Sequence, residues 1–214
     1  MLSKAFRAVM ILSALLLLSA TPGLAKEKVK VMTESPKAVE TRQALRDLWL
    51  GHIFWVRNVA YATKMGDAEG AKVAEENAVA NARSIADAVI PFYGKPAADK
   101  LFGLLAGHYG AVKEYQGAAY AGNREGQDAA VTKIKTNATE IASFLSTANP
   151  KNWPKDTLVG LLFAHGAHHM EQIDAFAVKD YAAEAKTWEM MKGHMYMIAD
   201  ALAGGLAKQF PKKF

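Results

Sequence analysis

The sequence predicts an all-α fold, a six-helix up-down array made of three repeated helical hairpins that form either a closed bundle or a short solenoid. Apolar residues recur at the three- and four-residue spacing of a buried helix face, as at Leu45, Leu48 and His52. Glycine and proline, 16 and 7 of 214 residues, gather in short clusters between long segments without helix breakers. Hydrophobic residues make up 51% of the chain, which favours a globular core over global disorder.

A repeat in the sequence predicts the three hairpins. Aligning His52 with His108 and His165 gives offsets of 56 and 57 residues, and the same offsets bring many other positions into register. The matching sets include Leu48, Leu104 and Leu161; Asp67, Asn123 and Asp180; Asn81, Asn137 and His194; and Ile85, Ile141 and Ile198. So many matches at one pair of offsets indicate three copies of one structural unit.

The first 25 residues have the pattern of a signal peptide. Lys4 and Arg7 precede an apolar run over residues 8–20, and Gly23-Leu24-Ala25 offers small residues for cleavage. The apolar run is about 13 residues long, shorter than the ~20 that a membrane-spanning helix needs. We therefore expect cleavage after Ala25, export to the periplasm or the exterior, and no membrane span in the mature chain.

A leader over residues 26–35 is expected to be flexible, and Ser35-Pro36 then provides an N-cap and a first helical position. Residues 36–214 are expected to form one helical domain with repeats at about 37–90, 96–147 and 155–207. The six helices are predicted at 37–65, 68–90, 96–121, 124–147, 155–178 and 181–207.

Each predicted hairpin has a recognisable turn. Asp67, Asn123 and Asp180 are suitable N-caps for the returning helices. Glycine precedes the first two caps, where a helix C-terminus favours it, whereas Lys179 precedes the third. The third turn is therefore expected to be built differently.

Composition excludes several classes of protein. The chain without its first 25 residues keeps a small positive charge that is too dispersed to indicate a nucleic-acid partner. The chain has no cysteine, which excludes disulfides, thiolate metal sites and covalently attached c-type haem. It also contains no nucleotide-binding loop and no Gly-x-Ser-x-Gly motif, so an enzyme is not the favoured interpretation.

The repeat predicts a polar layer inside the fold. His52 lies 15 residues before Asp67 and Asn81 lies 14 after it. At a rise of ~1.5 Å per residue, both should therefore lie ~21–22 Å from the turn. The other hairpins have the same spacing, which places six residues in one layer: His52, Asn81, His108, Asn137, His165 and His194. One interpretation is structural, with each asparagine amide pairing with an imidazole and the layer fixing the helix register.

The other interpretation is a metal site, and the third hairpin offers the best set. His168 follows His165 by one turn, Glu171 follows by one more, and His194 lies opposite. Three imidazoles and a carboxylate suit Zn, Cu, Ni or non-haem iron. Four methionines near His194 provide either soft ligands for Cu(I), an axial haem ligand, or simple core packing: Met190, Met191, Met195 and Met197.

Several segments resemble a family of uncharacterised bacterial proteins, most of them exported. They are Leu48-Trp49 with His52, Trp55 and Arg57; Pro91-Phe92-Tyr93-Gly94; Phe144-Leu145-Ser146 with Ala148-Asn149-Pro150; and Gln209-Phe210-Pro211 with Phe214. The resemblance covers nearly all of the mature chain. It implies an exported helical protein with inward histidine and asparagine positions and brings no established function.

These observations favour a binding protein of the cell envelope or exterior that holds a transition metal (Zn, Cu or Ni) or another small ligand. The alternative is a structural or protein-interaction module whose histidine and asparagine layer only stabilises the fold. Arg57 is expected either to pair with a neighbouring carboxylate or to bind an anionic ligand.

Overall fold

The computed structural model describes residues 34–214, and the predicted all-α fold is confirmed. The predicted signal peptide and most of the predicted leader lie outside the described residues. Six long helices carry the fold, together with two short helical segments. Their bounds are α1 Pro36–Met65, α2 Ala68–Asp87, α3 Ile90–Tyr93, α4 Lys95–Tyr120, α5 Arg124–Ala148, α6 Lys155–Ala177, α7 Tyr181–Gln209 and the 3₁₀ helix η1 Pro211–Lys213.

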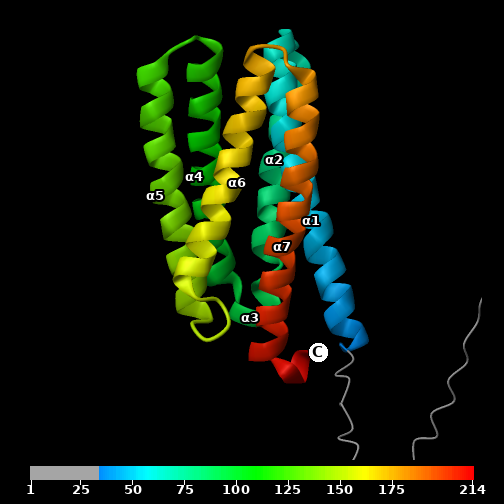
Figure 1. Cartoon of the computed structure of the whole chain (residues 1–214). Coiled ribbons are helices and arrows are strands. Elements are labelled where there is room, and N and C mark those ends of the chain that lie inside the picture. The colour runs from blue at the N-terminus through cyan, green and yellow to red at the C-terminus, as the bar shows by residue number, and fades with distance from the viewer. Residues whose placement is uncertain (1–33) are drawn as a thin grey trace, which may run out of the picture. The chain divides into compact units, whose positions relative to one another are not determined.

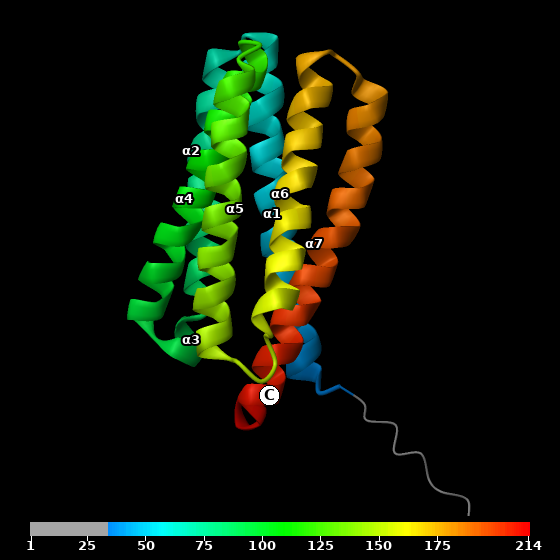
Figure 2. The ribbon, with the colours of Figure 1, turned by 60° about the vertical axis from the view of Figure 1, so that its left-hand side comes forward.

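The six long helices form a closed bundle and not an open solenoid. The three hairpins are α1–α2, α4–α5 and α6–α7, and their turns all lie at the same end (Figure 1). The second helix of each hairpin packs against the first helix of the next, and α7 closes the ring against α1. The first helices of the hairpins, α1, α4 and α6, also contact one another (compare Figure 2). They run in the same direction and form the inside of the bundle.

The hairpin turns follow the predicted chemistry. Asp67, Asn123 and Asp180 each cap a helix by accepting a hydrogen bond from the backbone amide three residues on. Lys179 adopts a φ of 59°, in the same left-handed region as the preceding glycines of the other turns. The third turn was expected to differ, but its backbone follows the same path as the other two. Lys179 adopts the left-handed conformation that Gly66 and Gly122 adopt in those turns.

The opposite end of the bundle contains the proline-rich connections. The second predicted helix ends at Asp87 and not at residue 90, because residues 90–93 form the separate turn α3. The loop between α5 and α6 is held by Asn149, whose side chain donates to the Gly205 carbonyl at 2.9 Å. Trp153 lies over the same part of α7 and donates from its indole nitrogen to the Ala201 carbonyl at 3.1 Å.

Two hydrophobic clusters fill the interior. The larger one extends towards the connection end and includes Leu45, Leu101, Leu158 and Leu202. The smaller one extends towards the hairpin turns and includes residues such as Ala60, Val112 and Phe176. Along α4 the larger cluster ends at Leu105 and the smaller begins at Ala111; along α6 the larger ends at Leu162 and the smaller begins at Ile173. The core is therefore interrupted at one level, and this level contains the histidines described below.

Two bidentate ion pairs join the first and last helices. Arg46 donates to both carboxylate oxygens of Asp200 at 2.7 and 2.6 Å. Arg57 donates to both oxygens of Glu184 at 2.6 Å. Arg57 thus has a carboxylate partner, as one of its two predicted roles required. Within residues 34–214, no helix combines the length and hydropathy needed to cross a membrane.

Candidate functional site: a buried cluster of four histidines

Four histidine side chains converge in the middle of the bundle. His52 comes from α1, His108 from α4, and His165 and His169 from α6. One ring nitrogen of each lies within 4.8 Å of the corresponding nitrogens of the other three. All four residues are at most 5% exposed, so the imidazoles are closed off from bulk solvent. We refer to these four residues as the histidine cluster.

The helix geometry explains how the cluster forms. His52, His108 and His165 occupy equivalent positions on the three inner helices, which run in the same direction, so they reach the same level. His169 lies one turn after His165 on the same face of α6, and their ring centroids are 4.5 Å apart. His165 also lies 5.5 Å from His52 and 5.4 Å from His108, centroid to centroid. His165 is therefore the central member.

Hydrogen bonding leaves much of the cluster unsatisfied. The Nε2 atoms of His165 and His169 are 3.2 Å apart, so one can donate to the other. Among the described residues, no partner lies near four other ring nitrogens of the cluster: Nε2 of His52, Nδ1 and Nε2 of His108, and Nδ1 of His165. A buried polar atom without a partner typically costs ~1–3 kcal/mol. A neutral imidazole has one N–H group and one lone pair, so His108 lacks a partner for both, and the lone pairs of the cluster could serve as ligands.

The outer helices do not supply those partners. Asn81 and Asn137 donate from their amide nitrogens to the carbonyls of Leu48 and Leu104, each at 3.0 Å. His194 donates from Nε2 to the Leu161 carbonyl at 2.8 Å, and its ring lies in the equivalent place. The asparagine amide groups were predicted to pair with imidazoles, but they donate to backbone carbonyls. Asn81, Asn137 and His194 each donate instead to a backbone carbonyl that lies four residues before the histidine of the neighbouring inner helix.

Burial keeps the four imidazoles neutral. It lowers the pKa of His52 to about 3, with a smaller contribution from His108, and lowers the pKa of His108 to about 4. Asn137 opposes the second shift slightly, although no hydrogen bond of ordinary geometry joins it to His108. Burial also lowers the pKa values of His165 and His169, and the neighbouring histidines lower them further. A neutral imidazole is the form that binds a metal ion.

The structure brings together only part of the metal set predicted for the third hairpin. His165 belongs to the buried cluster, whereas His168 faces outward between α6 and α7. There its Nδ1 lies 3.4 Å from the carboxylate of Glu171, and its ring centroid lies 5.5 Å from that of His194. Glu171 is exposed, with 52% of its side chain accessible. The helix geometry is the cause: the fourth residue after His165 on α6 faces the bundle axis, and the third faces α7.

His169 was not among the predicted site residues. Its sequence signal was the spacing of four from His165, which places both rings on one helix face.

The methionines near His194 lie on two different faces of α7. Met191 and Met195 are fully buried in the larger hydrophobic cluster, and Met190 and Met197 are exposed. The methionines therefore act as packing and surface residues and do not form a common ligand set.

A chain of polar contacts extends from the cluster's side of α6 to the surface. Gln172 lies one turn after His169 and donates to Glu184 at 3.0 Å. Glu184 is 2% exposed and is held by Arg57, whose side chain is partly accessible. The Gln172 side-chain oxygen is buried without a partner. The Glu184 carboxylate, the buried carboxylate on this path, is therefore already paired with the Arg57 guanidinium.

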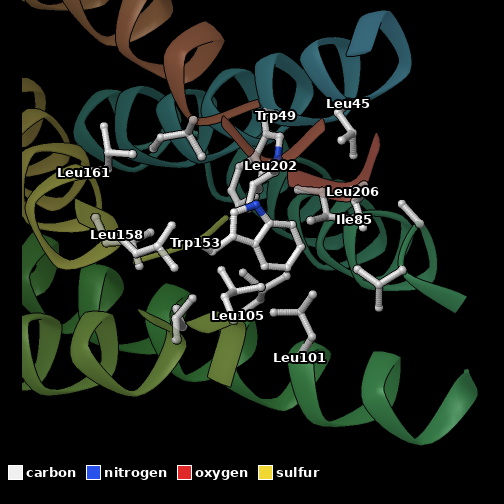
Figure 3. A pocket seen from close by; sticks show the side chains of 16 residues that line it. Leu45, Trp49, Ile85, Leu101, Leu105, Trp153, Leu158, Leu161, Leu202 and Leu206 are labelled. Carbon is white, nitrogen blue, oxygen red and sulfur yellow. The ribbon is translucent and has the colours of Figure 1, made fainter. Parts of the chain in front are cut away.

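Two enclosed cavities inside the described bundle are small. An apolar cavity of about 50 Å³ lies in the larger hydrophobic cluster, where Trp49, Leu105 and Leu202 gather around Trp153 (Figure 3). Its lining is almost entirely hydrocarbon, and cavities of this kind stay dry. A second cavity of about 50 Å³ touches His52 and Tyr109 between α1, α2 and α4. Neither is large enough for an organic cofactor, so the cluster is suited to a single ion.

No family model, curated protein or solved structure matched this chain.

Proposed function

We propose that this protein binds one transition-metal ion per chain through His52, His108, His165 and His169. The observation that carries the proposal is the convergence of four buried, neutral imidazoles, three of which have ring nitrogens without a hydrogen-bond partner. An ion at their centre would replace several unsatisfied polar atoms with coordinate bonds. Imidazole nitrogen is a good ligand for Zn, Cu and Ni.

The spacing supports four-coordination. Metal–nitrogen bonds of about 2.0–2.1 Å in a tetrahedron require nitrogens about 3.3–3.4 Å apart. The Nε2 atoms of His165 and His169 are already 3.2 Å apart. The other donor atoms lie within 4.8 Å, so ring rotations and shifts of about 1 Å would complete the set.

Four protein ligands also favour binding over catalysis. Catalytic metal sites keep a coordination position open for water or substrate, whereas closed sites do not. The signal-peptide pattern supports a location in the periplasm or outside the cell. The function proposed here is therefore that of an exported metal-binding protein.

We further propose that the three hairpins are internal repeats, because the hydrogen bonds to the Leu48, Leu104 and Leu161 carbonyls recur at the sequence offsets of 56 and 57.

The test begins with protein made without an affinity tag and treated with a chelator. Zn(II), Ni(II) and Cu(I) are each added, unbound ion is removed, and bound metal is measured by elemental analysis together with thermal unfolding. We expect one ion per chain. A ligand at one hundred times its dissociation constant stabilises the folded state by about 2.7 kcal/mol.

Variants separate the cluster from its surroundings. His52→Ala and His169→Ala should each weaken binding by about a hundredfold or more, because each removes a ligand. His168→Ala is the matched control, because it removes the adjacent histidine of α6, which lies outside the cluster. Equal loss in His168→Ala and His169→Ala would contradict the proposed ligand set. Binding of none of the ions to the wild-type protein would favour the alternative, a structural or interaction module.

A further inference from the structure

The charge of the cluster's surroundings has a consequence for the kind of ion it selects. All four donor residues are neutral when they bind a metal, and no carboxylate belongs to the group. The pKa values of the four imidazoles are set by burial, by one another, by nearby histidines and, for His108, by an asparagine. Among the described residues, no carboxylate raises any of these pKa values. The site therefore provides donor atoms without compensating negative charge.

Three acidic side chains of α6 and α7 have partners outside the cluster. Glu184 is held by the bidentate pair with Arg57. Asp174 accepts hydrogen bonds from the Tyr115 hydroxyl at 3.0 and 2.9 Å, and burial raises its pKa. Glu171 is at the surface beside His168. None of them is part of the cluster, so an ion bound there would keep its full charge.

Hydrophobic clusters enclose the site on both sides along the bundle axis. The free energy needed to move an ion from water into such surroundings grows with the square of its charge, so it is roughly four times larger for a divalent ion than for a monovalent ion of similar size. A bound anion would compensate the charge of a divalent ion, but a tetrahedral ion held by four imidazoles has no coordination position left for one. This difference opposes Zn(II), Ni(II) and Cu(II) and has a much smaller effect on Cu(I).

We propose that the histidine cluster selects a monovalent ion, Cu(I), over divalent ions. The inference rests on the proposed function and adds the charge of the ion to it. Copper is the metal among those suited to imidazole that has a stable monovalent state. The donors are borderline in softness, so the selectivity comes from the charge of the site and its apolar surroundings.

A competition experiment tests the selectivity. Metal-free protein is titrated without oxygen with Cu(I) supplied as its coloured bicinchoninate complex, and loss of colour reports transfer of Cu(I) to the protein. Zn(II) is then added in hundredfold excess, and the bound metals are measured after removal of free ions. We expect Cu(I) to remain bound. Displacement of Cu(I) by this excess of Zn(II) would overturn the proposal, whereas failure of every ion to bind would remove the proposed function itself.

A pair of variants tests whether charge is the cause. His169→Asp places a carboxylate among the ligands, and His169→Asn places a neutral side chain of nearly the same size. We expect the ratio of Zn(II) to Cu(I) affinity to be at least about tenfold higher in His169→Asp than in His169→Asn, because the carboxylate compensates one unit of charge. Equal ratios would refute the charge argument. Circular dichroism checks folding, and His52→Asp with His52→Asn provides the same comparison if the first pair is unfolded.

Discussion

Acid should destabilise the metal-free protein strongly, because its buried histidines must remain neutral in the folded state. Unfolded histidine has a pKa near 6.5, whereas the folded values are about 3 for His52 and about 4 for His108. The unfolded chain therefore binds more protons as the pH falls below 6.5. Stability is then fully present above that pH and is lost progressively towards the folded pKa values.

The magnitude follows from the two pKa values. Between neutral pH and pH 5, each of the two residues should reduce the free energy of unfolding by about 2 kcal/mol. The shifts of His165 and His169 act in the same direction. A loss of about 4 kcal/mol is a large part of the 5–15 kcal/mol that stabilises a typical domain. With a denaturant slope of about 2 kcal/mol per molar urea, the unfolding midpoint should fall by about 2 M.

The assay is urea unfolding followed by circular dichroism, with a chelator present, at neutral pH and at pH 5. His108→Leu should lose about 2 kcal/mol less than the wild type over this interval, because one titrating group has been removed. Met195→Ala, which leaves a cavity at a fully buried position without changing titration, should be destabilised by a similar amount at both pH values. An unfolding midpoint that does not change with pH in the wild type would refute the reasoning.

Four further substitutions test a turn, the packing and an ion pair. Lys179→Gly should stabilise the protein by about 1 kcal/mol in urea unfolding, because glycine adopts the left-handed φ of this position without strain. Gly205→Ala should destabilise the protein by about 1–3 kcal/mol, because the new methyl group would overlap the Trp153 indole. Gly204→Ala faces open space and should stabilise the helix by about 0.5–1 kcal/mol. If Gly204→Ala unfolds at a lower temperature than Gly205→Ala, this packing is contradicted. Glu184→Ala should reduce the free energy of unfolding by about 2 kcal/mol by leaving buried polar groups without their acceptor, and an unchanged urea midpoint would show that this ion pair adds nothing.

Local rules were sufficient to predict most of the fold. Helical periodicity gave the six helices, and the caps at Asp67, Asn123 and Asp180 gave the hairpin turns. Counting residues from each turn also predicted that His52, His108 and His165 lie at one level. These features depend on chain geometry within one helix or hairpin, so one sequence can specify them.

The composition of the site could not be predicted in the same way. Four residues along a helix bring a side chain to within about 40° of its starting direction, and three residues bring it to about 60° on the other side. Whether His168 or His169 completes the cluster therefore depends on how α6 is rotated against α1 and α4, which is a property of the assembled bundle. For the same reason, residue counting placed Asn81 near His52 but did not distinguish the imidazole from the Leu48 carbonyl one turn away.

The pairing of the first helix with the last has a consequence for the order in which the chain can fold. The ion pairs that join α1 to α7 connect residues 154 and 127 positions apart in the sequence. Contacts of such high sequence separation form late, because a long loop must close before they contribute. A chain emerging from the ribosome can form individual hairpins early. It leaves one side of α1 uncovered until the last 29-residue helix arrives. A truncation that removes α7 should therefore yield an incompletely folded, protease-sensitive chain and not a smaller stable domain.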